Sequence, residues 1–265
     1  MTGRDLFASV AAMTLHGLVL HLPILSTIVA AVFAFELFSR YRAKGGGPHL
    51  FWWGIGMVTY SVGTGTEALT TLCGWNPVVF RFWYVAGAYL GGYPLAQGSV
   101  FLLMNRRFAT WSAVFWSSVI VLGGILVFLS PLNLDAAEAH RLSGRVLGWT
   151  WLRLISPFIN VYSVVFLAGG AILSAWRFRR EPALRDRYAG NILIACGALL
   201  PAIGGSFTRF GYVEVLYVTE LCGLLLIHSG YKRCLAAPRP VAAAEAGLQP
   251  AAAAGVTSAG VAGNR

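Results

Sequence analysis

Ionisable side chains inside long apolar runs are the first candidates for chemistry in this 265-residue sequence. Those that stand out are His16, His21, Glu67, Glu214, Glu220 and His228. A charged side chain at the centre of a membrane costs about 3 kcal/mol on insertion scales, so each of these residues is a functional candidate. Small and hydroxyl-bearing residues precede Glu67 at helical spacing, namely Gly56, Tyr60 and Gly63. Carboxyl groups in such surroundings suit either the binding of a polar ligand or acid catalysis.

The elements that must position these residues are membrane-spanning helices. Hydrophobic residues make up 57% of the chain and charged residues 11%, whereas roughly 25% of an average soluble domain is charged. The apolar residues come in runs of about 20 or more, the length that crosses a bilayer as an α-helix. We therefore expect an all-α fold, a polytopic bundle of seven transmembrane helices. The predicted spans are near 7–37, 51–73, 83–104, 111–131, 150–175, 189–208 and 212–231.

Lysine and arginine residues indicate the orientation of the bundle. They concentrate after the first, third, fifth and seventh predicted spans, as with Arg40, Arg106 and Arg185. Because cytoplasmic loops carry the excess of basic residues, the N-terminus is expected outside and the C-terminus in the cytoplasm. Residues 1–235 then form the transmembrane domain. The Ala-, Gly- and Pro-rich stretch 236–265 is expected to be a disordered cytoplasmic tail.

This topology assigns a depth to each ionisable residue. All but His228, which we interpret as structural, fall in the outer half of the bundle. We expect a polar pocket in or just under the outer surface, lined by spans one, two, three and seven, with Glu67 and Glu220 as its principal charged members. The other residues expected to line it are Tyr60, His16, His21, Arg81, Tyr84, Tyr93, Gln97 and Tyr217. A structural interpretation is also open, in which Glu67 pairs with Arg81, with a first-span histidine or with a hydroxyl group of another helix, and stabilises helix packing.

Residue types exclude or disfavour several chemistries. A retinal Schiff base needs a lysine within a span, and Lys44 and Lys232 both lie outside the spans. His16 and His21 project about 140° apart on a helix, so they would not share one metal, and the histidines do not form facing haem ligands. We expect no metal and no cofactor. Basic residues confined to loops indicate no nucleic-acid partner. The expected partners are membrane lipid, an apolar small-molecule ligand and a membrane or signalling protein.

Two resemblances lead to bacterial seven-helix membrane proteins, and one of them implies a sensory role. The block WNPVVFRFWYVAGAYLGGYPLAQG, residues 75–98, is similar to a block of uncharacterised bacterial seven-helix membrane proteins. The seven-span plan, with Tyr60 and Glu67 on the second span, resembles the seven-helix sensor region that precedes some bacterial histidine kinases. The resemblance covers about residues 10–232 and implies a ligand-binding or sensory role in the bacterial cytoplasmic (inner) membrane. No kinase domain follows these residues, so signalling would need a separate partner.

A third resemblance leads to an enzyme class. Small membrane-embedded terpene cyclases with seven helices carry acidic residues on the second and last helices, and Glu67 with Glu214 or Glu220 falls on the matching helices. The residues beside Glu67 in this sequence do not include the aromatic residue that the family carries beside the acid on its second helix. The resemblance implies acid catalysis on an isoprenoid or lipid, which needs a carboxyl group kept protonated in an apolar pocket. Whether the protein is an enzyme therefore stays open, as does a role as accessory subunit of a membrane complex.

Overall fold

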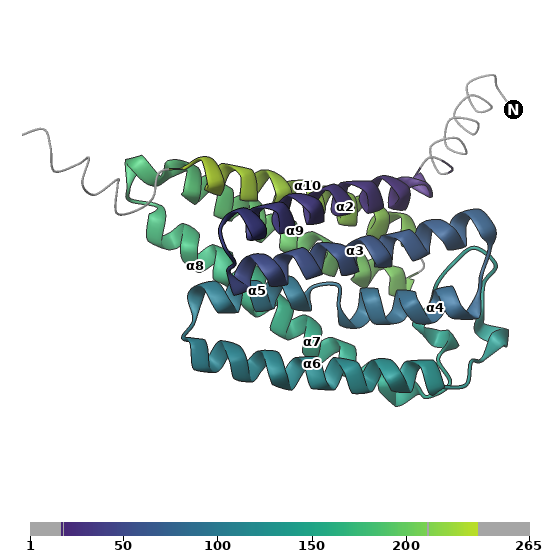
Figure 1. Ribbon diagram of the computed structural model, residues 1–265. Coiled ribbons are helices and arrows are strands. Elements are labelled where there is room, and N and C mark those ends of the chain that lie inside the picture. Colours follow the sequence, from purple (N-terminus) through teal and green to yellow (C-terminus); the bar gives the residue numbers. More distant parts are fainter. Residues whose placement is uncertain (1–16, 18, 211, 238–265) are drawn as a thin grey trace, which may run out of the picture.

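The computed structural model describes residues 17, 19–210 and 212–237, and over these residues the chain is helical without extended strands. The helices run roughly side by side along one direction (Figure 1). Isolated bridges occur in the connection between residues 130 and 150, joining Leu132 to Leu147 and Glu138 to Arg141. His16, most of the predicted first half of span one, and the predicted tail from residue 238 onward lie outside the described residues.

Within the described residues, the helical elements follow one another as consecutive segments separated by connections of the chain. The first two are α2 (Leu22–Ala43) and α3 (Pro48–Cys73). The third segment combines α4 (Pro77–Trp83), the π-helical η1 (Tyr84–Tyr89) and α5 (Tyr93–Leu103), and the fourth is α6 (Arg106–Leu129). After the short 3-10 turns η2 (Leu134–Ala136) and η3 (Gly144–Val146), the fifth combines η4 (Thr150–Leu154), α7 (Ile155–Ser163), the π-helical η5 (Val164–Ala168) and α8 (Gly169–Phe178). The last two are η6 (Pro182–Leu184) with α9 (Arg185–Phe207) and η7 (Thr208–Phe210), and then α10 (Val213–Ala236).

Within the residues that the structure describes, five helices are long and apolar enough to cross a membrane, which supports the prediction of a membrane protein. They are Leu22–Ala43, Arg106–Leu129, Thr150–Phe178, Pro182–Phe207 and Val213–Ala236. In each of these helices, less than half of the most apolar stretch is buried inside the protein. Large apolar side chains such as Phe35 and Trp111, each 74% exposed, point outward. Lipid is the solvent in which such surfaces are stable.

The other two segments differ from these five for identifiable reasons. α3 has 26 residues, but its many Gly, Ser and Thr residues lower its hydropathy. The segment predicted as one continuous span over 83–104 is interrupted at Leu90–Gly92, before α5 begins. Pro94 lacks the backbone N–H that a continuous helix would need, but proline is tolerated in the first turn of a helix, so α5 begins at this point. A side chain at Gly91 would collide with the Gly87 carbonyl oxygen. The close approach of these two backbone segments at the break therefore requires glycine.

Helices α9 and α10 pack closely because glycines recur every seven residues on both. A Cβ atom at Gly197 would lie 2.5 Å from the Gly223 carbonyl oxygen, and one at Gly230 would lie 2.5 Å from the Gly190 carbonyl oxygen. Small residues at such contacts let two backbones approach, which is a main source of helix association in membranes. Helix α10 also packs on α2, and α2 packs on α3. Helix α6 lies at the opposite edge of the bundle in Figure 1.

The chain connections gather most of the basic residues at one end of the bundle, which we call the basic end. The α2–α3 connection with Lys44, the start of α6 with Arg106 and Arg107, the start of α9 with Arg187, and the end of α10 meet there, at the left of Figure 1. One cavity at this end is lined by residues from α2, α3, α5, α8, α9 and α10. The α3–α4 and α6–α7 connections therefore lie at the other end.

Candidate functional site

Glu67 and Glu220, which the sequence places far apart, come together between α3 and α10. Glu67 stands about two turns before α3 ends at Cys73, and Glu220 about two turns after α10 begins at Val213. Both therefore lie in the half of the bundle away from the basic end. The two carboxyl groups interact directly. We call Glu67 and Glu220 the acid pair.

Each carboxyl group of the acid pair has one buried oxygen without an amide or hydroxyl donor. Glu67 is 4% exposed, and its Oε1 accepts a hydrogen bond of 2.9 Å from the indole nitrogen of Trp83. The Oε2 atoms of Glu67 and Glu220 are both buried and receive no such bond from the described residues. Two ionised carboxylates cannot hydrogen-bond to each other, so their direct contact requires a proton or another donor between them.

Two tyrosines complete the surroundings of the acid pair. The Tyr60 hydroxyl donates a 2.9 Å hydrogen bond to the backbone carbonyl oxygen of Glu220, which ties α3 to α10. Tyr217 is 4% exposed and lies within electrostatic range of both carboxyl groups. Of the predicted pocket residues, the structure thus brings together Tyr60, Glu67, Tyr217 and Glu220. Trp83, which is not among the predicted pocket residues, is part of the same group.

Arg81 and His21 do not join this group. The Arg81 guanidinium donates to the carbonyl oxygens of Pro77 and Ser130, at 3.4 and 3.1 Å. The pairing of Arg81 with Glu67 that the sequence left open is therefore replaced by the Trp83 hydrogen bond. His21 is exposed, and its Nδ1 donates a 2.8 Å hydrogen bond to the Gly17 carbonyl oxygen.

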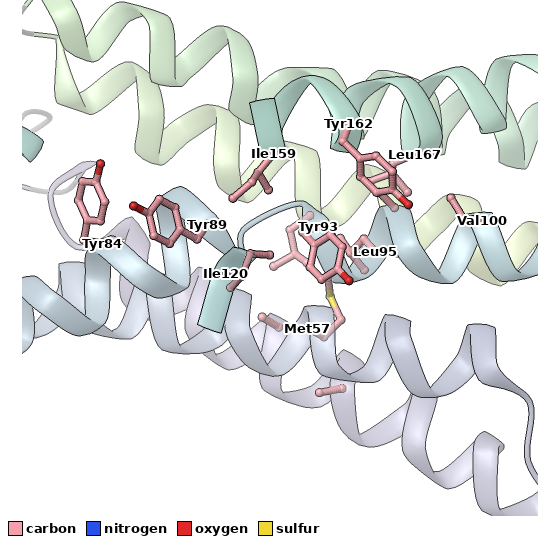
Figure 2. Packing of buried hydrophobic residues seen from close by; sticks show 14 of the residues in the cluster. Met57, Tyr84, Tyr89, Tyr93, Leu95, Val100, Ile120, Ile159, Tyr162 and Leu167 are labelled. Atoms are coloured by element: carbon pink, nitrogen blue, oxygen red, sulfur yellow. The ribbon is translucent and has the colours of Figure 1, made fainter. Parts of the chain in front are cut away.

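The remaining predicted residues, Tyr84, Tyr93 and Gln97, lie in the packed core, as Figure 2 shows for the two tyrosines. Gln97 is fully buried; its Nε2 donates to the Ala109 carbonyl oxygen at 2.8 Å, and its Oε1 accepts from Tyr162 at 2.7 Å. The Tyr93 hydroxyl lies 2.9 Å from the Ser117 hydroxyl. Tyr84 packs edge-on against the Tyr89 ring. The Gln97 and Tyr93 contacts join α5 to α6 and α7, whereas the Tyr84–Tyr89 contact lies within η1.

A second charged group, near the basic end, includes a residue that the sequence reasoning missed. Glu36 on α2 lies 2.9 Å from the Lys232 amine and 3.1 Å from His228 Nε2. The signal was present, because His228 and Lys232 are four residues apart on one helical face and Glu36 is the acidic residue of α2. The structural interpretation of His228 stays a prediction, now with these partners.

Two cavities lie elsewhere in the bundle. The first, about 530 Å³, is apolar and lies between α3, the third segment and α6, lined by residues such as Ile55, Tyr93 and Phe128. The second, about 640 Å³, opens at the basic end. Neither Glu67 nor Glu220 lines either of them. Among the described residues, no group of three or more His, Cys, Asp or Glu side chains is arranged to hold a metal ion.

Comparison with known proteins adds no relative from which a role could be transferred. No family model, curated protein or solved structure matches this chain. Its function is therefore to be inferred from the acid pair and the surrounding geometry.

Proposed function

We propose that the chain is an integral membrane protein that binds a ligand or senses a stimulus, with the acid pair as its ligand site. The observation that carries this proposal is the meeting of two carboxyl groups, each with a buried Oε2 that lacks an amide or hydroxyl donor in the described part of the chain. A buried acceptor without a donor costs about 1–3 kcal/mol. A ligand that places a donor between Glu67 and Glu220 would remove this cost.

The chemistry of the acid pair limits what the ligand can be. Both groups are acceptors, so the ligand must supply N–H or O–H donors. The smallest such ligand is a proton shared by the two carboxyl groups. A compact ammonium or hydroxyl group of a small molecule is the larger alternative.

A stimulus at the acid pair would be transmitted along α10. The Tyr60 hydroxyl donates a hydrogen bond to the backbone of Glu220, and the side chain of Glu220 belongs to the acid pair. A change in the contact between Glu67 and Glu220 therefore alters how α10 is held against α3. The far end of α10 carries His228 and Lys232 against Glu36. In this proposal a separate signalling protein reads the position of that end.

The proposal includes seven membrane crossings, with the basic end in the cytoplasm of a bacterial inner membrane. The shared location of Lys44, Leu103, Phe178 and Leu235 around one cavity supports it, because these residues stand at the ends of four different segments. Helices that alternate in direction bring alternate connections to the same end. The acid pair then lies toward the outer surface.

Trp83 provides a test of the ligand site, because its indole nitrogen donates to Glu67. We would reconstitute the full chain in lipid nanodiscs and record tryptophan fluorescence of the wild type and of a Trp83→Phe variant. The difference between the two spectra reports on Trp83 alone. The titrants would be protons and, separately, methylammonium. We expect the difference spectrum to change with at least one titrant, and Glu220→Gln, measured with and without Trp83→Phe, to abolish that change.

The matched control is Glu138→Gln, which removes an exposed carboxylate in the connection before α7. It should respond as the wild type does. An unchanged response in a variant with both Glu67→Gln and Glu220→Gln would contradict the proposal.

A second function, acid catalysis on an isoprenoid or lipid, is favoured by one observation. Aromatic side chains of Tyr60, Trp83 and Tyr217 surround the acid pair, and aromatic faces stabilise cations such as those formed by protonating an olefin. Incubation with geranylgeraniol and product analysis by gas chromatography with mass spectrometry would test it. Cyclised product that disappears in Glu67→Gln would support catalysis, and recovery of unchanged substrate would contradict it.

A further inference from the structure

The cavity at the basic end has the size and construction of a ligand site. Its volume is about 640 Å³, within the range of roughly 300–1,000 Å³ typical of small-molecule pockets. Its walls come from six helices that are distant in sequence: α2, α3, α5, α8, α9 and α10. Leu102 and Leu235 at its edge are 52% and 38% exposed, so the cavity reaches the lipid-facing surface.

The lining of this cavity is apolar within and basic at one side. The apolar walls include Phe33, Leu37, Leu50, Leu95, Leu167 and Ile227. Arg40, Lys44 and Arg187 supply positive charge, and no aspartate or glutamate is among the described residues that line the cavity. The nearby carboxylate, Glu36, is paired with Lys232 and His228. An anionic group beside Arg40 would therefore be attracted by positive charge. It would face no unpaired carboxylate among the described lining residues.

The hydroxyl of Tyr231 gives a second, independent observation. It lines the cavity, is buried, and has no hydrogen-bond partner among the described residues. The ring itself is held in place by Phe33 and Trp53, with centroid separations of 5.4 and 6.3 Å. A buried hydroxyl without a partner costs about 1–3 kcal/mol, and an acceptor oxygen of a ligand would satisfy it.

We infer that this cavity binds an amphiphile with a net-anionic phosphate head group, with its phosphate beside Arg40 and its hydrocarbon chain among the apolar walls. Guanidinium groups bind phosphate through paired N–H donors, which an ammonium group cannot reproduce. The lateral exposure at Leu102 and Leu235 allows a lipid chain to enter from the bilayer. The site is distinct from the acid pair, and its occupancy does not depend on the proposed sensory function.

Native mass spectrometry of the full chain in detergent micelles tests this inference. The probes are dioleoyl phosphatidylglycerol, dioleoyl phosphatidylcholine and inorganic phosphate, and thermal unfolding reports whether each variant is folded. We expect one phosphatidylglycerol to bind more tightly than either other probe. Loss of a charged hydrogen bond at Arg40→Gln should weaken that binding by about tenfold or more.

The matched control for Arg40 is Arg42→Gln, which removes the same charge two residues away, where the side chain is exposed and does not line the cavity. It should bind phosphatidylglycerol as the wild type does. Equal loss in the Arg40 and Arg42 variants would overturn the inference, because it would show surface attraction alone. Equal binding of phosphatidylcholine would overturn the requirement for a net negative head group, since the phosphate of that lipid is balanced by its choline cation.

Two further variants separate the head of the ligand from its chain. Ser174→Phe fills part of the cavity without changing charge and should weaken lipid binding, and Tyr231→Phe should weaken it while leaving the unfolding temperature of the lipid-free protein unchanged. If Ser174→Phe fails to fold, Tyr231→Phe decides, because it removes only an oxygen atom. Binding of inorganic phosphate as tight as that of the lipid, or full affinity in Tyr231→Phe, would overturn the inference.

Discussion

At the scale of single residues, buried polar side chains in this protein divide into two kinds. Gln97 has protein partners for both ends of its amide group. Glu67 and Glu220 each retain a carboxyl oxygen that no amide or hydroxyl donor of the described residues reaches. Fully partnered groups of the first kind stabilise helix packing, whereas groups of the second kind leave room for a ligand or a proton.

Replacing Gln97 should test its structural role. In Gln97→Leu the Tyr162 hydroxyl loses its acceptor and the Ala109 carbonyl loses its donor, in a fully buried position. We expect a destabilisation of about 2–4 kcal/mol. Thermal unfolding in detergent would measure it. A double variant with Tyr162→Phe should lose less than the sum of the two single variants, and strict additivity would contradict the hydrogen bond.

The acid pair should respond differently to two substitutions of Glu67. Glu67→Gln keeps an acceptor for Trp83 and adds a donor for Glu220, so we expect a change in unfolding free energy below about 1 kcal/mol. Glu67→Ala leaves the Trp83 indole nitrogen and the Glu220 carboxyl group without this partner and should cost about 2–4 kcal/mol. Equal destabilisation by both substitutions would show that the geometry of the pair is different.

At the scale of elements, glycine spacing decides how closely α9 and α10 approach. Gly197 faces the α10 backbone at Gly223, while Gly205, on the same helix, has open space where a Cβ atom would stand. The two glycines therefore serve different purposes although they share a helix. The contrast offers a comparison within one element.

Alanine at these two glycines should have opposite effects. Gly197→Ala forces α9 and α10 apart and should destabilise the bundle by about 1–3 kcal/mol. Gly205→Ala meets no neighbouring atom and should leave stability unchanged or raise it by up to about 1 kcal/mol, since alanine favours helix. Unfolding midpoints of the two variants, measured side by side, decide the matter. Equal effects would contradict the close contact.

At the scale of the whole molecule, the arrangement of connections separates a basic end from an opposite end that carries Cys73 and Glu138. Helices α2, α6, α9 and α10 each have the length and hydropathy of a membrane span, as does the segment Thr150–Phe178. If α3 and the third segment both cross the membrane, the protein has seven spans. If neither crosses it, the protein has five.

Cysteine labelling distinguishes these two topologies. Cys73 is exposed at the end of α3, and Arg107 is exposed at the start of α6. With the other cysteines changed to serine, Cys73 in intact cells should react with a membrane-impermeant maleimide. A cysteine introduced by Arg107→Cys, with Cys73 also replaced, should react only after permeabilisation. Reaction of both sites under the same condition would show that the third segment does not cross the membrane.

The sequence by itself determined that this is a helical protein suited to a membrane, because runs of apolar residues and the sidedness of Lys and Arg are local properties. It also singled out Glu67 and Glu220, since a carboxyl group in an apolar run is costly wherever the helix packs. Trp83 as the partner of Glu67, the contact between Glu36 and Lys232, and the burial of Gln97 in the core were decided only by the tertiary structure. Each of these depends on the rotation of one helix against another, and that rotation is set by packing contacts such as Gly197 against Gly223, which no single helix contains.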